Sequence, residues 1–181
     1  LVSRSTTIRE IIDLYESTGL FDSGSLPLES AEAIIPQTIE KNDDIFSGAS
    51  GILVSPLQVA ISLTPLSNEG RLTTPQIATA YSPAIDQWNL IDQGSNPSTI
   101  PNFDAESAAT LLISGDFPGW EIASHAFYQD ADISWYAAGT PSDWHGSPIT
   151  IVVALENSSP SIARSIGREL FFTATDSLES K

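Results

Sequence analysis

Ser124 and His125 stand next to each other and are the pair in this sequence that most resembles a nucleophile with its base. A serine hydroxyl becomes a strong nucleophile when a neighbouring base accepts its proton through a hydrogen bond. The run around them, Trp120 to Ala126, is rich in aromatic and apolar residues and predicts a β-strand. Adjacent residues of a strand point to opposite faces, so these side chains cannot easily meet. We therefore interpret the pair as structural or solvent-facing.

Carboxylates and imidazoles offer two further groups that could hold a metal ion. Asp143-Trp144-His145 supplies one imidazole and one carboxylate, fewer than the three or four ligands that zinc prefers. Asp130 and Asp132 bracket a turn that lacks the additional oxygen ligands of a calcium site. We therefore predict no metal and no other cofactor. Trp144 is expected to pack its loop against the protein.

Trp120 and Trp135 fall on neighbouring predicted strands and could form a groove on which a sugar stacks. Packing in the core or across two strands is the more common use of such a pair. The sequence therefore predicts packing, with a groove as the alternative.

These side chains lie in an apolar stretch from Trp120 to Glu156, which contains three runs of β-branched and aromatic residues separated by polar turns. Sequential strands with short connections usually pair antiparallel, so we predict a three-stranded meander. The third strand, Ile149–Leu155, is apolar almost throughout. We therefore expect it to be buried on both faces, deep in the sheet.

Helices are predicted on both sides of this stretch in the sequence, and the fold class is therefore α+β. Thr7 with Glu10 and Ser55 with Gln58 are capping boxes, each of which marks the start of a helix. A short helix is predicted at Ala105 to Leu112, and a last helix is predicted to begin at Ser159 and to fray from Asp176. Its predicted buried face consists of Ile162, Ala163, Ile166, Leu170 and Phe171.

Between the first two helices, Leu20 to Gln37 is predicted to form an irregular arm, and Ser82 to Asp104 is predicted to be loop-rich. Residues 1–181 contain no recognisable boundary or internal repeat. They therefore fit a single domain or a large fragment of one domain.

The composition excludes several classes of protein. A net charge of −16 and a pI near 4.1 repel phosphate backbones and anionic lipids, so we expect neither nucleic-acid binding nor direct membrane insertion. No apolar run approaches the roughly 18 residues of a membrane helix. Cysteine is absent, which excludes thiol chemistry. Because methionine is also absent, we expect that the chain was processed or excised from a longer one.

Several segments in order resemble the C-terminal part of a penicillin-binding protein transpeptidase domain. Ile52 to Ala60 followed by Leu66 to Gly70 resembles the helix ahead of the last active-site motif of that family. Ser134 to Pro141 resembles the next strand, often written Ala-Trp-Phe-x-Gly-x-x-Pro. Ile149 to Asn157, followed by the helix through Ile166-Gly-Arg168, resembles the final strand and helix.

The resemblance implies that the active-site motifs are degenerate or missing. The family uses Ser-x-x-Lys, Ser-x-Asn and Lys-Thr-Gly to acylate a serine with a D-alanyl peptide or a β-lactam. The first is absent from the chain, which has lysine only at Lys41 and Lys181. The Lys-Thr-Gly position aligns with Ile122-Ala123-Ser124, followed by His125. This chain alone is therefore not expected to be an enzyme.

The resemblance leads us to expect a non-catalytic, penicillin-binding-like module, a pseudoenzyme of the bacterial cell envelope that acts in cell-wall assembly or scaffolding. Its expected location is extracytoplasmic, in the periplasm or at the cell surface, tethered through a segment absent from this chain. Two alternatives remain: the C-terminal half of a split or proteolysed D,D-transpeptidase, and an extracellular structural subunit. Peptidoglycan or cell-wall proteins are candidate partners.

A free edge on the apolar strand Ile149–Leu155 would invite aggregation. We therefore expect that edge to be covered by the missing N-terminal part of the parent protein, by a second copy, or by the Leu20–Gln37 arm.

Overall fold

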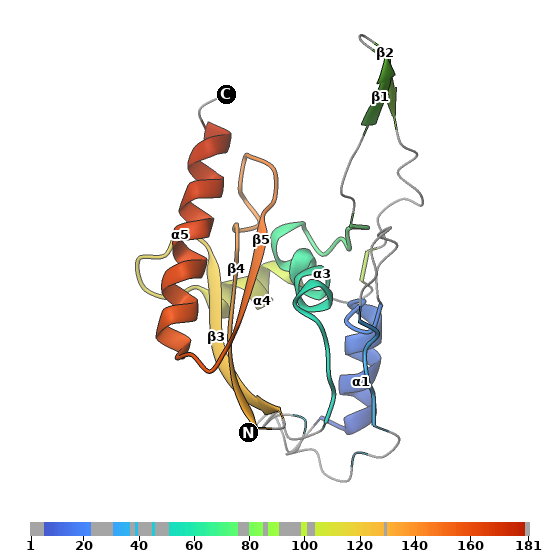
Figure 1. Cartoon of the computed structure of the whole chain (residues 1–181), viewed down its shortest axis with the longest axis vertical. Helices are drawn as coiled ribbons and strands as arrows, with labels where there is room; N and C mark the ends of the chain where they lie inside the picture. The colour runs from blue at the N-terminus through green and yellow to red at the C-terminus, as the bar shows by residue number, and fades with distance from the viewer. Residues whose placement is uncertain are drawn as a thin grey trace.

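A three-stranded antiparallel sheet lies between helices in the computed structural model (Figure 1). The structure describes residues 6–22, 31–36, 39, 45, 51–75, 80–84, 87–90, 99–100, 104–128 and 130–179. Helix α5 (Pro160–Glu179) covers one face of the sheet, and α3 (Pro56–Ser67) with α4 (Ala105–Leu112) covers part of the other. The predicted α+β class is confirmed. No helix in these ranges is both long and apolar enough to cross a membrane.

The sheet has the predicted meander order. Strand β3 (Trp120–Tyr128) pairs with β4 (Ala131–Gly139), which pairs with β5 (Thr150–Glu156). The burial of β5 differs from the prediction, since Val153 is its only fully buried residue and Glu156 is exposed. An apolar run predicts a central strand. Among the described residues β5 has a strand neighbour on one side only, so it lies at the edge of the sheet.

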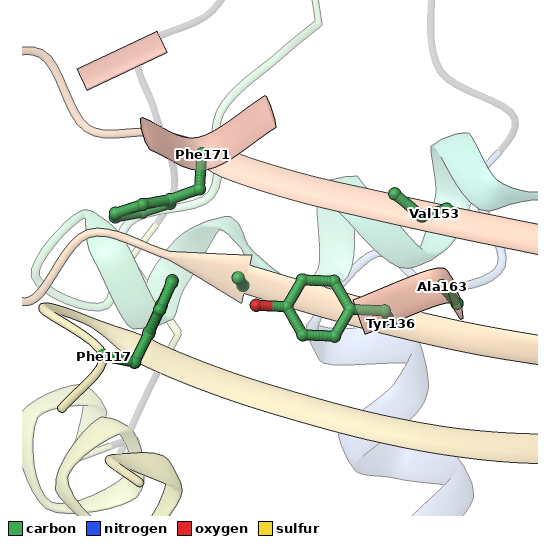
Figure 2. Close-up of a cluster of buried hydrophobic side chains, with 6 residues drawn as sticks. Phe117, Tyr136, Val153, Ala163 and Phe171 are labelled. Atoms are coloured by element: carbon green, nitrogen blue, oxygen red, sulfur yellow. The ribbon is translucent and has the colours of Figure 1, made fainter. Parts of the chain in front are cut away.

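The face of the sheet under α5 contains the larger hydrophobic cluster (Figure 2). Its buried members are Phe117, Tyr136, Ala138, Val153, Ala163 and Phe171. Gly167 lies so close to the ring of Tyr136 that a Cβ atom there would be 2.0 Å from Cδ1. A glycine in the middle of a helix costs about 1 kcal/mol relative to alanine, and here it allows α5 to approach the sheet.

On the opposite face, Trp120 is the centre of a second cluster with Leu66, Ala109 and Ala137. Its side chain is 0% exposed, and its indole Nε1 donates a 2.9 Å hydrogen bond to Oγ of Ser67 on α3. This hydrogen bond satisfies the one polar atom of a fully buried tryptophan. The predicted packing role is therefore confirmed for Trp120.

Both predicted capping boxes are present. Helix α1 (Ile8–Ser17) begins with reciprocal hydrogen bonds between Thr7 and Glu10, and α3 begins with the same pattern between Ser55 and Gln58. Helix α3 ends two residues after Pro65, and α4 has the predicted bounds. The end of α5 differs from the prediction, because the helix continues through Asp176 to Glu179.

The buried stripe of α5 also differs from the prediction. Ala163, Gly167 and Phe171 face the sheet, whereas Ile162, Ile166 and Leu170 are exposed. The prediction is thus right for Ala163 and Phe171. Both stripes repeat every four residues, and the close approach of Gly167 to Tyr136 decides which one faces the sheet.

The segment from Ser82 to Asp104, predicted to be loop-rich, contains an unpredicted hairpin. Strands β1 (Ala80–Ala84) and β2 (Gln87–Leu90) pair antiparallel and project away from the layered part (Figure 1). In the predicted arm, Ile34 forms an isolated bridge with Leu53. The described part of the arm therefore does not pair with β5.

Candidate functional site

An apolar pocket of about 800 Å³ lies against the part of the sheet that α3 and α4 leave uncovered. The sheet contributes residues of β3, β4 and β5, helix α3 contributes Val59 and Leu63, and the N-terminal segments contribute the remaining wall. The strand residues that border it are Ile122, Ser124, Ala126, Phe127, Ile133, Trp135, Tyr136, Ala137 and Val152. The N-terminal wall includes Tyr15, Leu20, Ala31, Glu32, Ile34, Ile45, Ile52 and Leu53.

The residues aligned with Lys-Thr-Gly separate onto the two faces of β3. Ile122, which is 44% exposed, and Ser124 line the pocket. Ala123 packs against the cluster under α5. His125 is exposed, and its ring contacts that of Phe127 edge-on with centroids 5.6 Å apart. The alternation along the strand therefore keeps Ser124 and His125 apart, as predicted from their adjacency.

Only one of the two candidate groove tryptophans borders the pocket. Trp135, opposite Ser124 on the neighbouring strand, is partly buried and lines the pocket wall. Trp120 is completely enclosed by α3, α4 and the sheet, so it cannot stack against a ligand. The groove hypothesis is wrong for Trp120. This residue lies four positions before Ser124, the cross-strand neighbour of Trp135, at the end of the sheet that α3 and α4 cover.

Glu121 forms a polar centre that the sequence analysis did not anticipate. Its side chain is 1% exposed and accepts two hydrogen bonds from Arg168 of α5, at 2.9 Å from Nε and 2.7 Å from Nη2. The Tyr136 hydroxyl donates a third at 2.9 Å. Arg164 approaches the same carboxylate at 3.9 Å. The guanidinium of Arg168 also lies 5.2 Å from the centre of the Phe117 ring.

The surroundings of Glu121 keep it ionised. Hydrogen bonds from Arg168 lower the pKa of the Glu121 carboxyl below its ordinary value, against the opposing effect of burial. Burial and the nearby carboxylate raise the pKa of the Tyr136 hydroxyl. A carboxylate held ionised by a bidentate arginine is a poor general acid or base at neutral pH. We therefore interpret this centre as a structural link between β3 and α5.

The remaining candidates do not assemble a metal site. Within the described residues, no three histidine, aspartate or glutamate side chains are grouped to hold a metal ion. Asp143 and His145 are exposed in the β4–β5 connection. Between them, Trp144 is half-buried, and its ring lies against Gly146. Asp130 is exposed at the β3–β4 turn.

Comparison with known proteins gave no family. No protein-family model matches the chain, and no curated protein and no solved structure resembles it significantly.

Proposed function

We propose that this chain is a non-catalytic, penicillin-binding-like module on the outer side of a bacterial envelope, with a role in cell-wall assembly or scaffolding. The order of its elements supports the proposal: a capped helix, an antiparallel three-stranded sheet and a C-terminal helix follow one another as in the resemblance. The family is proposed from the resemblance of Ile52–Ala60, Leu66–Gly70, Ser134–Pro141, Ile149–Asn157 and Ile166–Arg168.

The observation that carries the non-catalytic part is the chemistry of the pocket wall on β3. Transpeptidases of this family place the lysine ammonium of Lys-Thr-Gly beside the reacting serine. In this chain, Ile122 and Ser124 line the pocket at the aligned positions, and Glu32 is the single charged residue among the lining residues described. A pocket wall without a cation cannot attract a substrate carboxylate.

The partner is proposed to bind along β5, which has an unpaired outer edge among the described residues and is apolar from Ile151 to Leu155. Natural sheets usually protect such edges with charges, bulges or a covering element. Helix α5 extends this surface. Arg164 and Arg168 reach β3, and positions two residues further along a helix lie about 200° away around its axis. The exposed Ile166 and Leu170 are therefore on the flank toward β5.

A strand-plus-helix partner would fit this surface, because it could extend the sheet and cover the α5 flank at once. The missing N-terminal part of the parent protein and a second copy of the chain are the two proposed sources. Peptidoglycan or other cell-wall proteins would then be bound by the assembled module.

Labelling with a fluorescent penicillin tests the proposed function. The chain and its full-length parent are incubated with the reagent beside an active transpeptidase, and covalent fluorescence is read after denaturation. We expect no labelling of either protein. Labelling of the parent would instead identify the chain as the C-terminal half of a split or proteolysed transpeptidase whose nucleophile lies on the missing segment.

The open β5 edge also favours a second candidate, an extracellular structural subunit that assembles through its own edges. Sedimentation of the purified chain over a concentration series distinguishes this candidate. Open-ended oligomers that grow with concentration would support the subunit. A monomer that associates only with the missing part of the parent would support the module.

A further inference from the structure

We propose that the pocket between the sheet and the N-terminal segments is a docking site for a basic amphipathic helix of a partner protein. The inference depends on the pocket alone and goes beyond the proposed envelope function, which concerns the β5 edge and the lost Lys-Thr-Gly motif. Three features of the described residues carry it: the length of the apolar wall, the exposure of its rim and the sign of the surrounding charge.

The length of the wall matches a short helix. On β4 the lining residues run from Ile133 to Ala137. At about 3.3 Å per residue this segment spans roughly 13 Å. A helix rises about 1.5 Å per residue, so some nine residues would cover the wall and present apolar side chains at i, i+3 or i+4, and i+7. Val59 and Leu63 on α3 provide one side of the same trough.

The rim favours a macromolecule over a small enclosed ligand. Ile34 is 56% exposed and Ile122 is 44% exposed, although both line the pocket. Exposed apolar groups around a concave apolar surface typically mark a protein–protein contact. A small molecule inside the pocket would leave these side chains in water, whereas a helix lying across the mouth would cover them.

The charge around the pocket selects a basic partner. Glu32 lines it, Glu156 is the cross-strand neighbour of the lining residue Ile133, and the exposed Glu16 and Asp22 adjoin the N-terminal wall. No lysine or arginine is present among the described lining residues. Arg164 and Arg168 are bound to Glu121 on the opposite face.

A second copy of this chain is a poor occupant of the pocket for the same reason, because with seven basic residues against 23 acidic ones it would bring few cations to these carboxylates. Lysine or arginine flanking an apolar stripe would complement the carboxylates and accelerate association. The chemistry that fits is therefore leucine-like anchors on one helix face and cations beside them.

Synthetic peptides test the proposal on the whole chain. The probe is a fluorescein-labelled leucine/lysine peptide of about 14 residues, four helical turns, with leucine at i, i+3, i+4 and i+7. A scrambled peptide of the same composition removes the stripe, and a leucine/glutamate peptide reverses the charge. Fluorescence anisotropy is expected to give binding of the leucine/lysine peptide at least about tenfold tighter than of either control. Its affinity should fall as salt screens the carboxylates.

Two variants localise the binding. Ala126→Arg puts a cation into the pocket wall and should weaken binding at least about tenfold. Ser165→Arg adds the same charge at an exposed position of α5, on the opposite side of the sheet, and should change binding less than about twofold. Near-ultraviolet circular dichroism checks that both variants fold. If Ala126→Arg does not, Ile34→Ser removes a mostly exposed rim side chain and should weaken binding at least about threefold.

Several outcomes would overturn the proposal. Equal binding of the scrambled peptide would mean simple charge attraction. Equal affinities of the pocket variants and Ser165→Arg would place the contact elsewhere. Binding of dodecyltrimethylammonium monomers that is lost in Ala126→Arg, without binding of the leucine/lysine peptide, would make the pocket a small-amphiphile site. None of these results depends on penicillin labelling, so the docking proposal and the proposed function can fail separately.

Discussion

Glu121 is the only residue of its strand to present a carboxylate, and the fold encloses that carboxylate between β3 and α5. Arg168 holds it with two hydrogen bonds and Tyr136 with a third. Desolvating a charge is costly, and the geometry here satisfies most of its lone pairs in return. The pair therefore fixes where α5 crosses the sheet.

Substitution of Glu121 by glutamine should destabilise the fold by about 2–3 kcal/mol, because it leaves a partly buried Arg168 without its counter-ion. Urea denaturation followed by circular dichroism measures this loss. Arg164→Gln is the matched control, since its contact is 3.9 Å long and its side chain is about half exposed. It should cost less than about 1 kcal/mol. Equal effects of the two substitutions would contradict the role of the bidentate pair.

The same centre predicts a pH dependence. Arg168 lowers the pKa of Glu121 in the folded chain below its ordinary value of 4.5, so the unfolded chain takes up the proton first as the pH falls. The stabilisation is fully present above that value and is lost as the pH drops through the lower, folded-state pKa. The stability difference between wild type and Glu121→Gln should therefore be constant at neutral pH and shrink below about pH 4.5. A difference that grew on acidification would refute this assignment.

Residue-level features differed in how far the sequence could predict them. The separation of Ser124 from His125 follows from strand alternation and required no tertiary information. The Glu121–Arg168 pair could not be found in this way, because its partners are 47 residues apart and no local pattern joins them. Trp120 and Trp135 look equivalent in sequence, and only the placement of α3 and α4 buries the first.

At the scale of elements, the contact between Gly167 and Tyr136 sets the distance between α5 and the sheet. Gly167→Ala should destabilise the fold by about 1–3 kcal/mol, although alanine favours a helix, because the new methyl group would overlap the buried ring. Thermal and urea unfolding measure the change. Ser165→Ala, at an exposed position of the same helix, should be neutral within about 0.5 kcal/mol. Stabilisation by Gly167→Ala would show that the contact relaxes freely.

The start of α3 offers a test of local sequence signals. Ser55→Ala removes the hydroxyl that accepts from the Gln58 backbone amide and should cost about 1 kcal/mol. Ser62→Ala, in the middle of the helix, removes a hydroxyl that bonds only within its own turn and should have a smaller effect. Chemical denaturation compares the two, and an equal loss would argue against the cap.

Helix starts, the bounds of α4 and the order of β3, β4 and β5 were all predictable, because capping and strand signals act over a few residues. The position of β5 at the edge of the sheet was not predictable. An apolar strand can have the same sequence whether it lies between two other strands or against a partner protein. The α5 stripe failed for a related reason. The prediction is right for Ala163 and Phe171 and wrong for the large Ile162, Ile166 and Leu170, which are exposed because Gly167 completes the buried stripe instead.

At the scale of the whole molecule, we propose that the exposed flank of α5 and the edge of β5, unpaired among the described residues, form one apolar surface for a partner. Ile166→Lys with Leu170→Lys should disrupt association at this surface while changing the unfolding free energy by less than about 1 kcal/mol, since both side chains are exposed. Pull-down with the proposed N-terminal part of a longer parent, together with sedimentation of the chain alone, measures the association. Exposed Ser161 and Ser165 changed to lysine are the control. Unaltered association of the Ile166/Leu170 variant would exclude the α5 flank.

Arg164 and Arg168 have a consequence beyond their own ion pairs. They are two of only seven basic residues, and both lie beside the buried carboxylate of Glu121, so few cations remain elsewhere to offset the net charge of −16. Copies of the chain should repel one another at long range in dilute buffer, which gives a positive second virial coefficient. They should attract one another only when added salt shortens the Debye length to about 10 Å or less. Association through the exposed apolar flank of α5 should therefore appear first at high protein concentration and high salt.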